Sequence, residues 1–131
     1  MRDLLSDDFQ QVVADSSMRH RSVLDILTKY QEAVGRVNRA VVKAATSCGC
    51  ISINAEKPSI PENISLQELP QYMSSHTDGQ LCEECRETLE SEIGMQLFYL
   101  ASLCNIFDLN LYDIFLKERK RLDTLGMFNL A

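Results

Sequence analysis

Residues 82–104 decide the fold, and they read CEECRETLESEIGMQLFYLASLC. Apolar residues fill much of this segment on several sides, which is typical of a helix at the centre of a helical protein. One face carries an apolar side chain at every third or fourth position, the spacing of an α-helix: Leu89, Ile93, Leu97, Leu100 and Cys104. We therefore predict a central helix over this range.

Three further helices are predicted around the central one. A first amphipathic helix is expected over residues 2–15, and a second over residues 23–47, where an apolar stripe alternates steps of four and three. Asn110, followed three residues later by Asp113, can cap a fourth helix over about 111–122. The predicted fold class is all-α, a bundle of about four helices.

The segment between the second helix and the central one, about residues 47–82, is predicted to be an insertion made mostly of loops. Pro58 and Pro61 exclude a long helix or a central strand from it. One short strand fits at residues 51–53, and residues 74–80 are polar and are predicted to be loop.

A capping-box pattern inside this insertion predicts one short helix. Ser65 is followed three residues later by Glu68, so the helix should begin near Leu66. Pro70 limits it to a turn or two, because proline cannot continue the backbone hydrogen-bond ladder.

Composition and charge describe one folded domain over residues 1–131, since 45% of the residues are apolar and 24% are charged. Thirteen basic and nineteen acidic side chains give a net charge of −6, which repels phosphate backbones, so we expect no nucleic-acid partner. The sequence has no apolar run long enough to cross a membrane and an acidic start unlike a secretory signal peptide. We expect a cytoplasmic protein without a membrane partner.

Four of the five cysteines form two pairs, Cys48-x-Cys50 and Cys82-x-x-Cys85, at the two ends of the insertion. Closing the insertion would bring four thiolates together, which is the ligand set that tetrahedral zinc prefers. Such a zinc ion would be structural, because protein sulfur would occupy every coordination position.

Other interpretations of the cysteines stay open. They could be reduced and unligated, or they could hold an iron–sulfur cluster or form a regulatory disulfide. His76 could replace one ligand, although a single loop histidine is more often solvated. Cys104 lies on the apolar stripe of the central helix and is predicted to be a core residue.

A second kind of signal comes from carboxylates on the second and the central predicted helix, Glu32 and Glu92. Three segments carry this signal: EAVGRV at 32–37, EIGMQLFYL at 92–100 and FDLNLYD at 107–113. With these segments, the chain resembles the MazG-type nucleotide pyrophosphohydrolase family over most of residues 20–122, apart from the insertion. That family has E-E-x-x-E on one helix and E-x-x-D on a later one. The resemblance implies an all-α fold in which these carboxylates hold magnesium against a nucleoside triphosphate.

The sequence departs from this pattern at the metal ligands. Only Glu32 and Glu92 keep their carboxylates, while Ala33, Arg36 and Met95 stand where the family has acids. A guanidinium and a thioether cannot replace anionic oxygens, and Arg36 would repel a cation. Glu32 and Arg36 also fit a simpler interpretation, an exposed ion pair four residues apart on one helix.

Three functions follow as hypotheses. The first is a catalytically degraded relative of this family that acts as a binding or regulatory module for a nucleotide or protein partner. The second is an active, magnesium-dependent pyrophosphohydrolase that uses Glu32, Glu92 and further acids such as Asp25 or Glu90. The third is a zinc-stabilised helical adaptor for a protein partner. In each case the apolar helix stripes predict a homo-oligomer.

Overall fold

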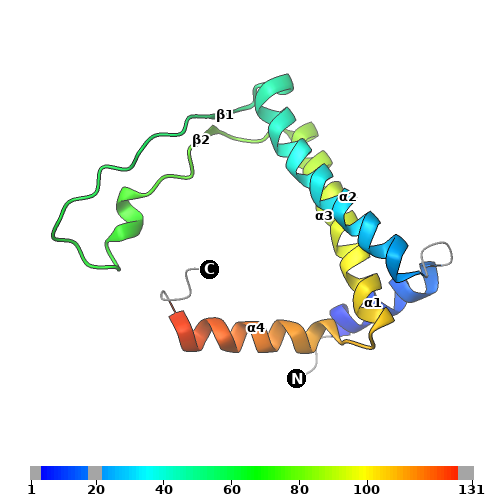
Figure 1. The fold of residues 1–131 in the computed structure, drawn as a ribbon. Coiled ribbons are helices and arrows are strands. Elements are labelled where there is room, and N and C mark those ends of the chain that lie inside the picture. Colours follow the sequence, from blue (N-terminus) through cyan, green and yellow to red (C-terminus); the bar gives the residue numbers. More distant parts are fainter. Residues whose placement is uncertain (1–3, 18–21, 127–131) are drawn as a thin grey trace.

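The computed structural model describes residues 4–17 and 22–126. Four α-helices dominate these residues (Figure 1): α1 (Leu4–Ser16), α2 (Val23–Lys43), α3 (Glu83–Ile106) and α4 (Leu111–Leu125). A five-residue π-helix, η1 (Ala44–Cys48), continues α2, and a 3-10 turn, η2 (Leu69–Tyr72), lies in the insertion. The predicted helical fold with four helices is confirmed.

The α2–α3 pair forms the main body of the molecule, and the two helices run side by side in opposite directions (Figure 1). Side-chain caps start both helices: the Ser22 hydroxyl accepts a hydrogen bond from the Leu24 N–H, and the Cys82 sulfur accepts one from the Cys85 N–H. The buried apolar residues lie mainly between α2 and α3 and where α1 packs on the C-terminal half of α3: Val13, Ile26, Ala33, Tyr99, Ala101 and Cys104.

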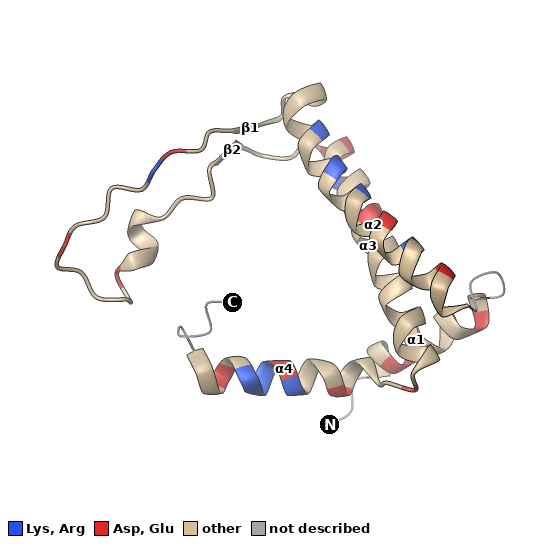
Figure 2. Ribbon diagram, viewed as in Figure 1, with Lys and Arg blue, Asp and Glu red and all other residues tan. Residues whose placement is uncertain are grey.

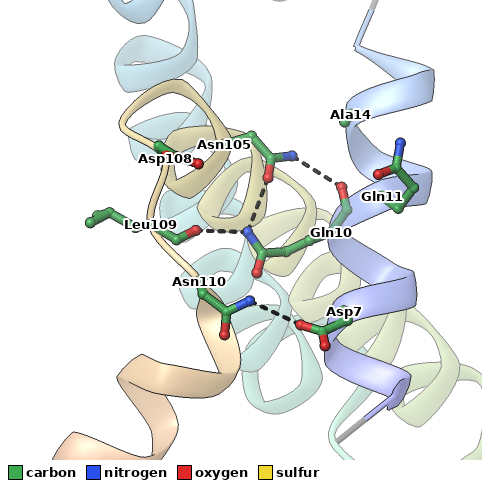
Figure 3. A pocket seen from close by; sticks show the side chains of 8 residues that line it. All are labelled: Asp7, Gln10, Gln11, Ala14, Asn105, Asp108, Leu109 and Asn110. Carbon is green, nitrogen blue, oxygen red and sulfur yellow. Dashed lines mark hydrogen bonds between the residues drawn. The ribbon is translucent and has the colours of Figure 1, made fainter. Parts of the chain in front are cut away.

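A polar network joins α1 to the α3–α4 connection (Figure 3). The Gln10 side-chain amide is buried, and its Nε2 donates to Asn105 Oδ1 at 3.0 Å and to the Leu109 carbonyl at 2.9 Å. Its Oε1 accepts a hydrogen bond, at 2.6 Å, from the N–H of Leu111, which is the first residue of α4. Because one side chain binds both helices and their connection, the direction of α4 relative to α1 and α3 is set by specific hydrogen bonds.

Residues between η1 and α3 form an arm that extends away from the helices (Figure 1). Its base is a two-stranded antiparallel sheet of β1 (Ile51–Ile53) and β2 (Thr77–Gly79), with Ile51 opposite Gly79. Gly79 has a φ of +86°, and a Cβ there would lie 2.6 Å from the Cys50 carbonyl oxygen, so only glycine fits. The strand predicted at 51–53 is confirmed.

Three expectations need correction. The predicted loop at 74–80 contains β2, and the helix predicted from Leu66 is instead the 3-10 turn η2, which begins three residues later with Pro70 in its first turn. Ser65 and Glu68 form only a backbone turn, in which the Glu68 N–H donates to the Ser65 carbonyl.

The third correction concerns the central helix and the bundle. Ile93 and Leu97 of α3 remain about 40% exposed, although both lie on the predicted apolar stripe. The helix α4 packs mainly on α1 and points away from the α2–α3 pair (Figure 1), so one chain does not form a closed bundle. In the part of the chain that the structure describes, no helix is long and apolar enough to cross a membrane.

Candidate functional site

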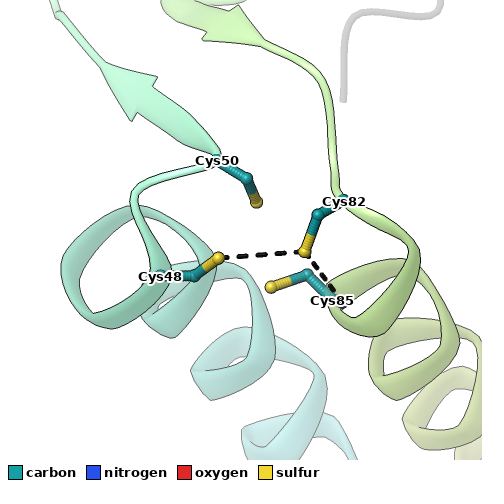
Figure 4. Close-up of side chains that lie close together, drawn as sticks. All are labelled: Cys48, Cys50, Cys82 and Cys85. Atoms are coloured by element: carbon teal, nitrogen blue, oxygen red, sulfur yellow. Dashed lines mark hydrogen bonds between the residues drawn. The ribbon is translucent and has the colours of Figure 1, made fainter.

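The four cysteines of the predicted zinc site converge at one end of the α2–α3 pair (Figure 4). Their sulfur atoms all lie within 4.8 Å of one another, and the Cys48 and Cys82 sulfurs are 3.8 Å apart. Zinc–sulfur bonds of ~2.3 Å in a regular tetrahedron place the sulfurs roughly 3.8 Å apart. The cluster therefore has nearly the dimensions that one tetrahedral ion requires.

Local backbone geometry positions each sulfur. Cys48 ends the π-helical turn η1, and Gly49 follows with a φ of +83° while its N–H donates to the Ala44 carbonyl at 2.8 Å. This left-handed residue reverses the chain, so that Cys50 lies on the same side as Cys48 (Figure 4). Pairing of β1 with β2 then returns the chain to the start of α3.

The second cysteine pair belongs to the first turn of α3. Cys82 is the N-cap residue, and its sulfur accepts a hydrogen bond from the Cys85 N–H at 3.4 Å. This bond, helped by the Cys85 side chain, lowers the pKa of the Cys82 thiol to about 7. The hydrogen bond to Cys82, together with desolvation, raises the pKa of Cys85 far above its ordinary value. Without a cation, some of the four crowded sulfurs therefore keep their protons. A divalent cation would compensate for the negative charge that remains when these protons leave.

The two other residues considered for this site in the sequence, Cys104 and His76, do not belong to the cluster. Cys104 is 3% exposed in the core, and the prediction that it is a packing residue is confirmed. His76 is outside the cluster; its Nδ1 accepts a hydrogen bond from the Glu56 N–H at 3.4 Å. All five cysteines are free thiols in this structure.

A groove between α2 and α3 holds the two carboxylates that the family resemblance singles out. Arg36 lies between them: its Nε is 3.0 Å from Glu92 Oε2, and its Nη1 is 3.7 Å from Glu32 Oε1. The groove has a volume of about 410 Å³, and Arg39, Lys43 and other residues also line it. The predicted ion pair of Glu32 with Arg36 is confirmed, and Arg36 additionally bridges to the facing helix.

The other positions compared with the family's ligands do not rebuild a carboxylate site. Ala33 is buried in the α2–α3 interface, and Met95 is exposed. Neither Asp25 nor Glu90 lines the groove. Within residues 4–17 and 22–126, the cysteines are the one group of three or more Cys, His, Asp or Glu side chains with ligand atoms close enough for a single ion.

Comparisons with known proteins found no matching family model, no matching curated protein and no matching solved structure. The chemistry of the two sites therefore carries the functional argument, because a helical fold alone does not imply a function.

Two features of the site were missed at the level of sequence. The basic residues Arg39 and Lys43 follow Arg36 at steps of three and four, a spacing that indicates one helix face beside the groove. The strand β2 was missed because Thr77 and Asp78 are polar and exposed, and only Gly79 signals the close backbone approach.

Proposed function

We propose that this chain is a MazG-like helical protein that has lost its catalytic metal site and acts as a binding or regulatory module with a structural zinc ion. The observation that carries the proposal is the position of Arg36 between Glu32 and Glu92. In an active relative, the carboxylates in this groove would hold magnesium. Here a side chain of the protein supplies the positive charge.

Charge arithmetic supports the loss of the catalytic metal. Magnesium is bound by hard oxygen ligands, and a site with two carboxylates and one guanidinium carries a net charge of only about −1. Arg39 and Lys43 line the same groove and make its overall charge positive. A divalent cation would therefore have to displace Arg36 and enter against neighbouring positive charges.

The same basic groove favours an anionic partner over a free metal ion. Arg39 and Lys43 are exposed, and neither takes part in an ion pair among the residues that the structure describes. Their positive charges can attract phosphate oxygens, so a nucleotide remains the small-molecule partner that we propose for the module. A nucleotide held there without magnesium would be bound but not hydrolysed.

Zinc is the cofactor that we propose for the cysteine cluster. Four protein sulfurs would fill a tetrahedral site and leave no position for a reactive water, which makes the role structural. The ion would tie η1 and β1 to the start of α3 and so hold the base of the arm. Zinc-bound thiolates suit a reducing compartment, and we propose a cytoplasmic location on that ground.

The third hypothesis, an adaptor for a protein partner, draws support from the arm itself. The arm extends away from the helices (Figure 1), and it carries the exposed apolar side chains Ile60, Leu66 and Met73. Apolar residues on an extended segment can bind another protein. This role is compatible with the zinc ion, which would set the direction of the arm.

The test of the proposal is an activity measurement. With Mg²⁺ or Mn²⁺ and a panel of nucleoside and deoxynucleoside triphosphates, we expect no release of pyrophosphate above background. Robust turnover that is lost in both Glu32→Gln and Glu92→Gln would instead establish the active pyrophosphohydrolase. Nucleotide binding in the absence of metal, weakened by Arg39→Gln with Lys43→Gln, would support the binding module.

A further inference from the structure

The cysteine cluster lies where the two ends of the arm meet. Cys48 ends η1 just before the arm, and Cys82 caps α3 just after it, so 34 positions separate these two residues in the sequence. No described residue of the arm takes part in an ion pair, and charged side chains are sparse along it (Figure 2). The four sulfurs are therefore a main connection between the base of the arm and the helices.

Exposure distinguishes Cys48 from the other cysteines. Cys48 is exposed, whereas Cys50, Cys82 and Cys85 are half-buried and Cys104 is buried. Every cysteine that binds zinc does so as a thiolate, which is also the form that oxidants attack. Among thiolates, the one that is most accessible to solvent is oxidised first. We therefore expect a small oxidant such as hydrogen peroxide to react at the Cys48 sulfur.

Cys82 is placed to react with an oxidised Cys48. The two sulfurs lie 3.8 Å apart and come from different elements, η1 and the start of α3 (Figure 4). A disulfide joins its sulfurs at ~2.05 Å, so these two would have to approach by roughly 1.8 Å. Rotation of two side chains can supply a movement of this size. A bond between them would cross the base of the arm.

We propose that Cys48 and Cys82 form a peroxide-sensitive site, in which their oxidation to a disulfide releases the zinc ion and keeps the two ends of the arm joined. The inference rests on the proposed zinc site and adds a modification of two of its ligands. The oxidant that it requires is a hydroperoxide, with hydrogen peroxide as the simplest case.

The chemistry takes two steps. The Cys48 thiolate attacks one oxygen of hydrogen peroxide; a sulfur–oxygen bond forms, the oxygen–oxygen bond breaks and hydroxide leaves, so that Cys48 becomes a sulfenic acid. The Cys82 thiolate then attacks the Cys48 sulfur; the disulfide bond forms, the sulfur–oxygen bond breaks and a second hydroxide leaves. The two thiolates lose two electrons in total, which reduce the peroxide. The solvent protonates both hydroxides to water.

The disulfide changes what the site can hold. Only the sulfurs of Cys50 and Cys85 remain as ligands, and a structural zinc site uses four. At the same time, the new covalent bond takes over the connection between η1 and the start of α3, and it restricts the unfolded chain as any long-loop disulfide does. The oxidised chain should therefore lose its zinc ion and still be more stable than a reduced chain without zinc.

Peroxide treatment of the zinc-loaded full chain tests the proposal. With about one equivalent of hydrogen peroxide, a chromogenic chelator should detect release of about one zinc ion per chain. Peptide mass mapping without reduction should find Cys48 linked to Cys82 and Cys104 unmodified. Dithiothreitol with added Zn²⁺ should restore the metal content. The oxidised chain should melt at a higher temperature than the chain that is reduced and stripped of zinc.

Two matched variants test which sulfur reacts first. Cys48→His and Cys50→His each leave three sulfurs and one nitrogen, a ligand set that also binds zinc. Cys48→His removes the proposed point of attack and should slow zinc release by at least about tenfold. Cys50→His keeps both reacting sulfurs and should release zinc at nearly the wild-type rate. The zinc content of each variant is measured before peroxide is added.

The outcomes separate this inference from the zinc site itself. A wild-type chain that holds no zinc before treatment would overturn both. A zinc-loaded wild type that keeps its zinc under peroxide, or that links a different pair of cysteines, would overturn this inference alone. Equal rates of zinc release from Cys48→His and Cys50→His would do the same, and so would an oxidised chain no more stable than the reduced, zinc-free chain.

Discussion

Two groups of candidate ligands lie along the same pair of helices, and they differ in what surrounds them. At one end, four cysteine sulfurs lie within 4.8 Å of one another. In the groove beside them, two carboxylates already hold a guanidinium between them. The cysteine cluster needs a cation from outside, whereas the carboxylate groove carries its own.

Residue type and spacing therefore describe a metal site only in part. Glu32 and Glu92 line the same groove, yet Arg36 lies between them and offsets one of their two negative charges. The net charge around the ligands decides whether a divalent ion binds.

The largest effect should follow from breaking the cysteine cluster. Cys82→Ser should release the zinc ion and lower the free energy of unfolding by more than about 4 kcal/mol, since loss of a structural metal is among the most disruptive changes. Metal analysis and thermal unfolding measure both quantities. Cys104→Ala is the control: it should keep the zinc ion, because Cys104 lies in the core. Equal melting temperatures for wild type and Cys82→Ser would contradict the proposed zinc site.

The apparent affinity for zinc should fall as the pH is lowered. The hydrogen bond from the Cys85 N–H lowers the pKa of Cys82 to about 7, so protons compete for this ligand below that pH. Cys85, with its pKa raised by the Cys82 side chain, must release a proton on binding at any pH near neutrality. We expect the affinity to decrease by about tenfold or more for each pH unit between 8 and 6. A competition titration with a chromogenic chelator measures it; a flat profile would argue against thiolate ligation.

A smaller effect should come from removing the internal cation of the groove. Arg36→Glu deletes the guanidinium and adds a third carboxylate, and it should strengthen Mn²⁺ binding by at least about tenfold, or ~1.4 kcal/mol. Arg39→Glu is the matched control, since Arg39 lines the groove outside the Glu32–Arg36–Glu92 contacts. Electron paramagnetic resonance of free Mn²⁺ gives both affinities. If the two variants bind equally, overall groove charge rather than the position of Arg36 controls the site.

The smallest effect concerns stability. Arg36→Gln should lower the free energy of unfolding by less than about 1 kcal/mol, because the Arg36 side chain is 60% exposed and solvent screens its ion pairs. Urea denaturation at low and high salt measures the difference, which should shrink at high salt. A loss of several kcal/mol would mean that Arg36 is a structural residue, and the argument from metal replacement would lose its support.

The geometry within each cysteine pair was predictable because it is local, and the meeting of the two pairs followed from closing the insertion between them. The x-x spacing on the first turn of α3 and the glycine between Cys48 and Cys50 act within a few residues. The bridge from Arg36 to Glu92 was not predictable, because it depends on how α2 packs against α3. The ion pair of Glu32 with Arg36 was predictable, because the two residues are four apart on one helix.

The direction of α4 also could not be predicted from the sequence pattern. Asn110 correctly marked the start of the helix, since its side chain accepts from the Asp113 N–H. The direction of α4 depends on the Gln10 amide about a hundred residues away in the chain, and on Asp108 in a left-handed conformation. Neither contact leaves a periodic signal, so the sequence predicts a bundle of about four helices but not the projection of α4 from the α2–α3 pair.

The most direct test of the account is the metal content of the protein after equilibrium dialysis against micromolar Zn²⁺ and Mn²⁺ together, measured relative to the dialysate by mass spectrometry of the elements. The account predicts close to one zinc ion per chain, held by Cys48, Cys50, Cys82 and Cys85, and no manganese above the dialysate. A zinc-free chain, or manganese bound at one ion or more per chain, would contradict it.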